Sequence, residues 1–179
     1  MIYLSAGHSN ADSGAVANGN KEADITKLLR DEIKKRLKSV ITDYDWETNA
    51  QHQNRIKPGS GSVIFDIHLN AAGTAAARGV ECYVNKADFA NKNSLSYQMA
   101  KVVCEEYSRI LGIPNRGVKP ENNSQHSRIG ILNLGAGIAV LCEVDFITHP
   151  EAVKNIKKIL NEIAFETADI LEVFEDLKM

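Results

Sequence analysis

The stretch that decides the fold is Val63-Ile64-Phe65-Asp66-Ile67-His68-Leu69-Asn70. Bulky apolar residues dominate it, and a short run of this kind is typical of a strand buried on both faces of a parallel sheet. In an open α/β sheet, ligands bind at the carboxyl ends of the strands. His68, near the end of this run, is therefore a candidate functional residue.

Strand and helix signals alternate on either side of this run. We expect strands over residues 1–6, 40–44, 63–69, 79–85 and 138–144. Apolar residues at helical spacing predict helices over 22–37 and 94–111 and one long final helix after residue 151, and the polar segment 48–57 is also expected to be helical. This alternation predicts an α/β fold: a single-domain three-layer sandwich, with a mostly parallel central sheet and helices on both faces.

Polar residues mark the expected ends of several elements. Asn20 is the expected N-cap of the helix over 22–37. The sequence Thr148-His149-Pro150-Glu151 has the form of a capping box with proline in the first turn, so we expect it to begin the final helix. Residues 113–137 lack regular signals, and a loop of this length in a compact domain is usually functional or disordered.

Composition and charge limit the functional classes. The chain has 179 residues, of which 44% are hydrophobic and 25% charged, values that fit one soluble globular domain. The net charge of −2 and the lack of a basic stripe argue against nucleic acid as a partner. No apolar run approaches the ~20 residues of a membrane span, so no membrane partner is expected. The N-terminus has no basic segment, which argues against a signal peptide and for a cytoplasmic start unless a leader was removed.

The cysteines do not suggest a chemical role. Cys82, Cys104 and Cys142 are odd in number and lack CxxC spacing, which argues against a disulfide framework and against a zinc knuckle. Each lies in an apolar stretch and is expected to be buried. Cys142 directly precedes Glu143, so on a strand the two side chains point to opposite faces, and Cys142 is a poor candidate for a nucleophile.

His8, Glu22 and His68 form a candidate metal set. His8 follows the strand over 1–6, Glu22 begins the first helix and His68 ends the third strand. Two histidines and one glutamate are a common ligand set for catalytic zinc, which keeps one coordination place for water. Taken singly, each has an ordinary explanation: a turn histidine, an acid at a helix N-terminus and a hydrogen-bonded core histidine. Because the topology sends all three to one edge of the sheet, the set favours a metal-dependent hydrolase.

Glu143 ends the apolar run 138–142. An unpaired charge is costly to bury there, so the carboxylate must be paired, bound to metal or catalytic, unless it faces solvent at the strand end. The remaining histidines have ordinary explanations. His149 belongs to the capping sequence, His52 lies in a polar helix and is expected to be exposed, and His126 is expected to be a solvated loop residue rather than a substrate contact.

A series of short motifs covers nearly the whole chain. They are Ala6-Gly7-His8, Asp12-Ser13-Gly14-Ala15, Lys21-Glu22-Ala23-Asp24, Asn54-Arg55, Asp66-Ile67-His68-Leu69-Asn70-Ala71, Gly79-Val80-Glu81-Cys82-Tyr83, Arg116-Gly117-Val118-Lys119, Ile131-Leu132 and Leu141-Cys142-Glu143-Val144-Asp145-Phe146. In order and spacing, this series resembles the zinc-dependent N-acetylmuramoyl-L-alanine amidases, which occur in bacterial cell-wall hydrolases and phage endolysins.

The resemblance implies one catalytic domain over residues 1–179, with one zinc ion held by His8, Glu22 and His68 and with Glu143 as the catalytic base. It implies peptidoglycan or muramyl peptides as the substrate, cleaved at the amide bond between N-acetylmuramic acid and L-alanine. The candidate substrate-binding residues are Asn70, Arg128 and Asn123. The expected place of action is the cell wall, reached either by release of a phage lysin from the cytoplasm or by export if a leader was removed. The sequence sets neither an oligomeric state nor the preferred peptidoglycan.

Three positions depart from the family pattern. Ser5 stands where an acid is common, Asp66 replaces a frequent serine, and Asp145 stands where glycine is common. None removes a ligand or the base, so they bear on subfamily and substrate detail. Two alternatives stay open on the sequence: a zinc peptidase that cleaves a different bond of the stem peptide, and a wall-binding module without catalysis.

Overall fold

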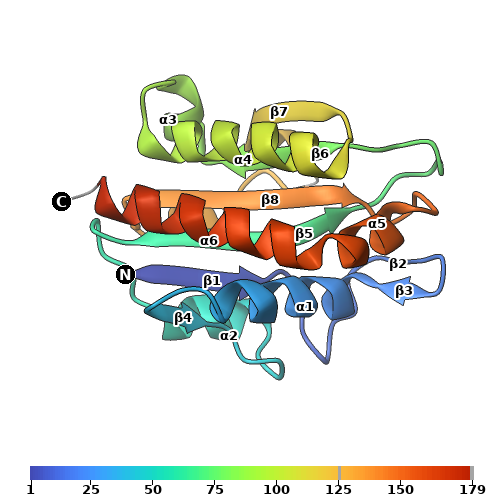
Figure 1. Ribbon diagram of the computed structural model, residues 1–179. Coiled ribbons are helices and arrows are strands. Elements are labelled where there is room, and N and C mark those ends of the chain that lie inside the picture. The colour runs from blue at the N-terminus through green and yellow to red at the C-terminus, as the bar shows by residue number, and fades with distance from the viewer. Residues whose placement is uncertain (125, 178–179) are drawn as a thin grey trace.

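The computed structural model describes residues 1–124 and 126–177. Its centre is a six-stranded sheet in the order β4-β1-β5-β8-β6-β7 (Figure 1). The strands are β1 (Ile2–Ala6), β4 (Val40–Thr42), β5 (Val63–Asn70), β6 (Val80–Val84), β7 (Asn115–Pro120) and β8 (Ile138–Phe146). The strands β4, β1, β5 and β8 run parallel, β6 runs antiparallel to β8, and β7 runs parallel to β6. The prediction of a mostly parallel sheet is therefore confirmed.

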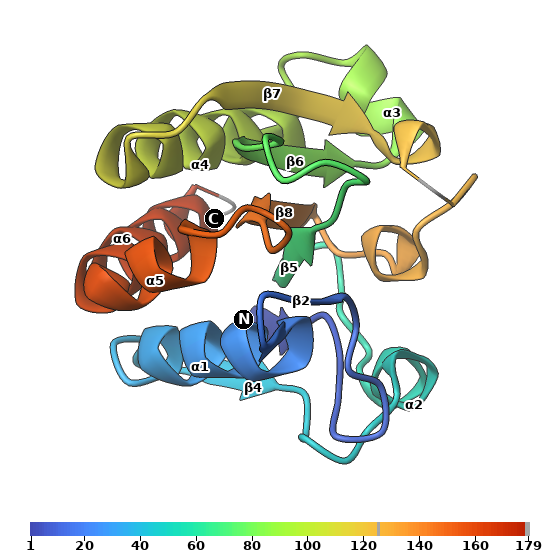
Figure 2. The ribbon, with the colours of Figure 1, turned by 90° about the vertical axis from the view of Figure 1, so that its right-hand side faces the viewer.

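Helices cover both faces of the sheet (Figure 2). One face carries α1 (Glu22–Lys34), α4 (Leu95–Leu111), α5 (Ala152–Lys158) and α6 (Leu160–Asp176). The other face carries α2 (Asn49–Arg55) and the short 3-10 helices η1 (Glu121–Asn123) and η2 (Gly130–Asn133). The short helix α3 (Lys86–Ala90) lies against α4 and β7. The expected α/β sandwich is thus confirmed, and none of its described helices has the length and apolarity needed to cross a bilayer.

Alternation along the strands divides the apolar side chains into two clusters, because successive residues of a strand point to opposite faces. The larger cluster joins Leu4, Phe65 and Val140 of the sheet to α1, α4 and α6. The smaller cluster lies on the α2 side, and its members are Tyr3, Ile56, Ile64, Tyr83, Ile131, Leu132, Ala139 and Leu141. Both faces of the central strands are therefore buried, as the continuous apolar runs predict.

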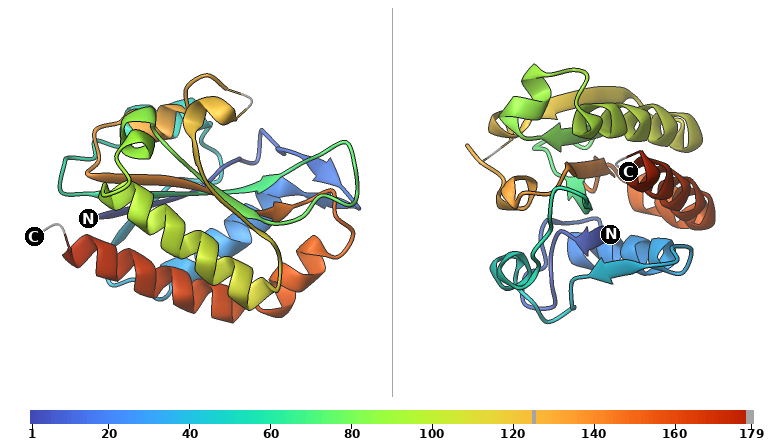
Figure 3. Two further views of the ribbon diagram at one scale, coloured as in Figure 1. Left: turned by 90° about the horizontal axis from the view of Figure 1, so that it is seen from above. Right: turned by 90° about the vertical axis from the view of Figure 1, so that its left-hand side faces the viewer.

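The start of β1 and the end of α6 lie at the same end of the sheet (Figure 3). The α-amino group of Met1 forms an ion pair there with Glu175 of α6. The loops that carry the candidate site residues lie at the far end of the sheet, where β1, β5 and β8 end.

The start of α1 differs from the expectation at Asn20. The residue at the N-cap is Lys21, whose side chain makes no capping hydrogen bond. Asn20 instead belongs to a small hairpin of β2 (Val16–Ala17) and β3 (Asn20–Lys21). The first amides of the helix donate to loop carbonyls, since Glu22 N bonds Ala15 O and Ala23 N bonds Ser13 O. The loop therefore does what a side-chain cap would do.

The expected long final helix is two helices, α5 and α6, separated at Ile159. The capping box over residues 148–151 does not form. Thr148 Oγ1 accepts from Ala72 N at 3.3 Å, and Glu151 N donates to His149 Nδ1 at 3.2 Å. Thr148 is thus engaged by the loop after β5, and α5 begins without a side-chain cap at its N-cap residue, Glu151.

α3 and β7, like the β2–β3 hairpin and the two 3-10 helices, lie where the sequence predicts no regular element. β7 is an edge strand within the segment 113–137, and its residues are largely polar or glycine. An edge strand pairs on one side only, so it needs no continuous apolar run. The segment expected to be one loop is therefore a strand followed by η1 and η2.

Candidate active site

The site residues meet because three parallel strands end together. Ser5 of β1 is in register with Asp66 of β5, and His68 of β5 is in register with Glu143 of β8. His8 follows β1 by two residues. The loop after β1 then returns the chain to the same edge, where α1 begins with Glu22. Four residues distant in sequence thus reach one edge of the sheet.

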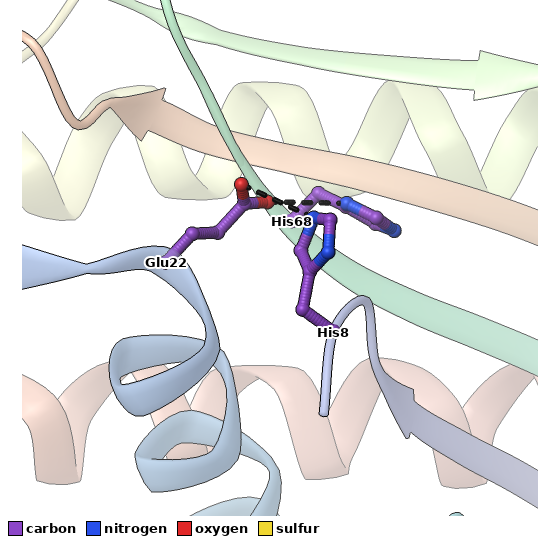
Figure 4. Close-up of side chains that lie close together, drawn as sticks. All are labelled: His8, Glu22 and His68. Carbon is purple, nitrogen blue, oxygen red and sulfur yellow. Dashed lines mark hydrogen bonds and ion pairs between the residues drawn. The ribbon is translucent and has the colours of Figure 1, made fainter. Parts of the chain in front are cut away.

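His8, Glu22 and His68 point toward one another (Figure 4). Glu22 Oε2 lies 3.2 Å from His8 Nε2, and Glu22 Oε1 lies 3.2 Å from His68 Nδ1. One potential ligand atom from each of the three residues lies within 4.8 Å of the others. The convergence that the sequence predicted is present, and the donor set of two imidazoles and one carboxylate fits a catalytic zinc.

Glu22 is fixed by the backbone as well as by the histidines. Its carboxylate accepts from Ala15 N at 3.0 Å and from Leu69 N at 2.9 Å. Burial raises the pKa of Glu22, but hydrogen bonds from His68 and His8 outweigh it and hold the pKa far below its usual value. Glu22 is therefore an ionised, immobile carboxylate at the centre of the group.

Each histidine also has a second carboxylate behind it. Asp12 Oδ2 lies 2.9 Å from His8 Nδ1, and Asp66 Oδ2 lies 3.2 Å from His68 Nε2. Burial lowers the pKa of both imidazoles, yet the surrounding acids raise it above its usual value, most strongly at His68. The pocket thus favours positive charge, which suits a divalent cation. A carboxylate behind a histidine is also the usual way to orient a metal-binding imidazole.

The rings of His8 and His68 occupy space that is open only because two neighbouring residues are glycines without a side chain. A Cβ at Gly7 would lie 2.1 Å from His68 Cε1. A Cβ at Gly14 would lie 2.5 Å from His8 Cδ2, and the backbone at Gly14 has a φ of +60°, which favours glycine. The Gly-His and Ser-Gly motifs of the sequence therefore have a packing reason at this site.

Glu143 differs from the acids around it. Its Oε2 atom is buried and has no hydrogen-bond partner among the described residues. Burial raises the pKa of Glu143 to about 7. A carboxyl group with such a pKa can both accept and donate a proton near neutral pH.

Glu81 lies opposite Glu143 in the β6–β8 pair. Unlike Glu143, it is fully engaged: Arg116 Nε donates to its Oε2 at 2.6 Å and Tyr83 Oη to its Oε1 at 2.8 Å, and Lys119 also binds it. Burial raises the pKa of Glu81, but the hydrogen bonds from Lys119 and Arg116 bring it below its usual value. Two facing acids with pKa values pushed apart are typical of one structural and one catalytic carboxylate.

A cavity of about 590 Å³ lies over these groups. Its lining includes His8, Glu22, His68 and Glu143, together with the predicted substrate-binding residues Asn70 and Arg128. Asn70 Nδ2 also donates to Glu81 Oε1 at 2.8 Å. Asn123 is exposed and is not part of this lining. His126 is exposed, as expected, but it also lines the cavity.

The expectation that His52 is exposed is wrong. His52 is 4% exposed, and its Nε2 atom has no hydrogen-bond partner among the described residues. It lies on α2, which begins with a capping box between Thr48 and Gln51 and packs against the sheet. The same helix supplies Asn49 and Gln53 to the cavity wall. Their spacing of four residues marks one helix face, but nothing in the polar sequence shows which face turns inward.

The three positions that depart from the family pattern all form hydrogen bonds within the protein. Ser5 Oγ donates to Asp66 Oδ1 at 2.6 Å, so the hydroxyl and the acid have exchanged strands relative to the common arrangement. Asp145 is buried and accepts from Arg78 Nη2 at 3.0 Å and from Gly79 N at 2.9 Å. The three cysteines are free and buried, as expected.

Comparison with known proteins assigns the family. Residues 2–171 match the family described as N-acetylmuramoyl-L-alanine amidase. The endolysin of Bacillus phage SPP1 is 30% identical over 198 residues, which cover 99% of this chain and 67% of the relative. The amidase LytC of Bacillus subtilis is 23% identical over 164 residues, 88% of this chain and 31% of LytC.

Solved structures agree with this assignment. A putative N-acetylmuramoyl-L-alanine amidase from Neisseria meningitidis superposes with a TM-score of 0.77 at 26% identity, over 96% of this chain and 93% of the other. An amidase from Clostridium difficile 630 superposes with a TM-score of 0.81 at 20% identity, over 98% and 96% of the two chains, which supports the fold. The chain therefore belongs to the N-acetylmuramoyl-L-alanine amidase family.

Proposed function

We propose that this protein is a zinc-dependent amidase that cleaves the bond between the lactyl group of N-acetylmuramic acid and L-alanine of the peptidoglycan stem peptide. The observation that carries the proposal is the convergence of His8, Glu22 and His68 beside Glu143, a carboxyl group that no described residue engages at Oε2. Family membership supports the substrate and the bond. The donor set supports the metal, and we propose one zinc ion per chain.

His8, Glu22 and His68 would hold the zinc through two imidazole nitrogens and one carboxylate oxygen. When bound, zinc lowers the pKa of a coordinated water and polarises a carbonyl oxygen. Asp12 and Asp66 keep the two imidazoles in place. Because backbone amides hold Glu22 and carboxylates hold both imidazoles, the protein itself preorganises the site.

Glu143 is the proposed proton carrier. The carboxylate accepts the proton of the attacking water and then delivers it to the departing nitrogen of L-alanine, which is a poor leaving group without it. The pKa of Glu143, raised to about 7 by burial, allows both transfers. Asn70 and Arg128 line the cavity and are the proposed contacts to the muramyl or peptide oxygens. A role for Asn123 would require substrate to extend beyond the cavity.

The place of action that follows is the cell wall. Among the relatives, one is named an endolysin and another, from Staphylococcus aureus, a probable autolysin. We propose the same substrate, peptidoglycan, for this chain.

Product analysis tests the proposal. Purified peptidoglycan is incubated with the zinc-loaded protein, and the released amino groups are identified. A new N-terminal L-alanine on an intact stem peptide is the expected product. Release of D-alanine or of an internal peptide amine would show a peptidase instead. Absence of any new amine, with binding to the wall retained, would show a module without catalysis. The matched control is Glu143→Gln, which keeps the side-chain shape and removes the base.

A further inference from the structure

The turn after β4 presents an aromatic pair to solvent. Tyr44 and Trp46 have 49% and 64% of their surface exposed, and their rings stack with centroids 5.5 Å apart and planes 8° from parallel. The guanidinium carbon of Arg55 lies 4.4 Å from the centroid of the Tyr44 ring. Trp46 is the only tryptophan of the chain. Unlike a singly exposed ring, this stacked pair presents two adjoining aromatic side chains that a ligand can contact together.

The turn is rigidly held although its rings are exposed. Glu47 N donates to Tyr44 O at 2.9 Å, and Tyr44 N donates to Glu47 Oε2 at 2.9 Å. Glu47 itself is buried and binds Arg55, whose Nη2 also donates to Thr42 O at 2.9 Å. Asp45, which lies between the two aromatic residues in the sequence, accepts from Arg30 Nη2 at 2.6 Å. A ring fixed in this way loses little conformational entropy when it binds a ligand.

The turn is joined to two segments that border the catalytic cavity. Asp45 O accepts from Asn10 N at 2.7 Å, which joins the turn to the loop that carries His8 and Asp12. Figure 2 shows these two loops next to each other at the same end of the sheet. On the other side, the turn leads into α2, which lines the cavity with Asn49 and Gln53. A polymer anchored in the cavity therefore has the aromatic pair along its path.

We propose that Trp46, supported by Tyr44, is a glycan subsite that stacks on a 2-acetamido sugar of the peptidoglycan strand next to the muramic acid being cleaved. This inference rests on the proposed function. A pyranose chair with equatorial substituents has a flat face of axial C–H groups, and this apolar face covers an indole ring well while the hydroxyl and acetamido groups stay in water.

The surroundings favour a neutral sugar over other occupants. Asp43, Asp45 and Glu47 neutralise Arg30 and Arg55, the arginines beside the turn, so these two side chains give an anionic lipid surface little attraction. Two side chains offer far less than the ~800 Å² per partner of a stable protein interface. A single sugar ring, in contrast, matches the size of one indole.

Trp46 fluorescence gives a direct test in the zinc-loaded full-length chain. The probe is the N-acetylglucosamine tetramer, which lacks the lactyl–alanine bond and is not hydrolysed. We expect a saturable change in emission with a half-point on the order of 1 mM. Anionic vesicles and a protein dilution series serve as comparison titrations. An emission change with vesicles or with protein concentration, and none with the tetramer, would overturn the proposal in favour of a membrane or a second copy.

Variants test the same idea without relying on the probe. Retention on insoluble chitin is measured for Trp46→Ala, for Trp46→Phe and for the control Phe165→Ala, which removes a ring that is 63% exposed in α6 on the opposite face of the sheet. We expect roughly tenfold weaker retention for Trp46→Ala, a smaller loss for Trp46→Phe and no change for the control. Equal retention of all four proteins would refute the subsite. Circular dichroism checks folding, and Trp46→Phe keeps the test valid if the alanine variant unfolds.

Activity measurements separate this proposal from the proposed function. Trp46→Ala should raise KM on polymeric peptidoglycan more than KM on a soluble muramyl dipeptide, whereas Phe165→Ala should change neither. Sugar binding without any amide cleavage would defeat the amidase assignment alone. Amide cleavage without a Trp46-dependent preference for the polymer would defeat the glycan subsite alone.

Discussion

Replacing Glu143 by glutamine should inactivate the protein and, at the same time, relieve a cost in its metal-free form. The buried Oε2 atom finds no partner among the described residues, and burial raises the pKa of Glu143 to about 7. The ionised side chain is therefore less stable in the folded protein than in the unfolded chain. Glutamine has the same shape and carries no charge.

The size of the effect follows from the pKa. A rise from 4.5 to about 7 corresponds to about 3 kcal/mol of unfolding free energy. Solvent reaches part of the side chain, which reduces the expected value to about 2 kcal/mol. Below pH ~4.5 the carboxyl group is protonated in both states and the cost is absent; it grows between pH ~4.5 and ~7, and stays constant above. Wild type should thus lose stability with rising pH relative to Glu143→Gln.

Urea unfolding followed by circular dichroism in excess chelator measures this difference. The two proteins are compared at about pH 5 and about pH 8.5, and the change in their stability difference between the two pH values is the quantity of interest. Any steric cost of glutamine is the same at both pH values and cancels. Glu22, His8 and His68 titrate in both proteins, so their contributions cancel to first order. We expect glutamine to gain about 2 kcal/mol relative to wild type on going to high pH.

Two results would refute this reasoning. A stability difference that does not change with pH would show that Glu143 is not held in a desolvating environment. Amide cleavage by the glutamine variant within tenfold of wild type would show that Glu143 is not the base, since loss of a general acid–base group costs about 10²–10⁴ in rate.

Three further predictions concern the metal group. Zinc at about a hundred times its Kd should stabilise the protein by about 2.7 kcal/mol, seen by calorimetry as a Tm increase of roughly 5–10 °C that chelator reverses, and no increase would exclude a bound ion. Asp66→Asn should weaken zinc binding about 10–100-fold in a chelator competition. Asp12→Asn should weaken zinc binding less, because the Asp12 side chain is 60% exposed; equal losses of affinity would contradict the argument that a buried carboxylate orients its histidine more strongly. Gly7→Ala should displace His68 and abolish stoichiometric zinc binding, measured by elemental analysis, whereas Gly73→Ala, whose Cβ meets nothing within 4 Å, should bind zinc as wild type does. Stoichiometric zinc in both variants would contradict the argument that Gly7 leaves room for the His68 ring.

The central strands and the edge that the site residues share could be predicted from local patterns, whereas the role of Glu143 as a base came from the resemblance to the amidase family. The run over 63–69 forms the strand Val63–Asn70. A short segment with bulky apolar side chains on both faces is typical of a central strand of a parallel sheet, where both faces are buried. The polar residues at its end, and at the ends of β1 and β8, had to meet because parallel strands finish at a common edge. The convergence of His8, Glu22, His68 and Glu143 follows from this geometry.

The direction of a strand is harder to predict from the sequence than its position. Alternation identifies a strand but is the same read in either direction, so nothing in residues 80–84 shows that β6 runs opposite to β8. The edge strand β7 lacks an apolar run altogether. The capping residue Thr148 shows a similar limit, because a loop amide, Ala72 N, competes for its hydroxyl.

The burial of side chains in polar segments is the hardest of these features to predict from the sequence. His52 has polar neighbours in sequence and is nevertheless buried, because the position of α2 is set by contacts made elsewhere. The residues around His52 include Ser5, Asp43 and Asp66, which are distant from it in sequence or belong to other elements. Interactions of this kind arise only after the chain has folded, so no local pattern predicts which face of α2 turns inward.

The position of β8 affects how the chain can fold as it is synthesised. This strand comes last in sequence but lies between β5 and β6, so the sheet is in two parts until residues 138–146 have left the ribosome. Until then, β5 and β6 each present an unpaired edge, which is a template for pairing with other chains. A nascent or prematurely terminated chain is thus prone to aggregate, and it also lacks Glu143. Closure of the sheet and acquisition of Glu143 are therefore one event, because a chain that ends before β8 has neither.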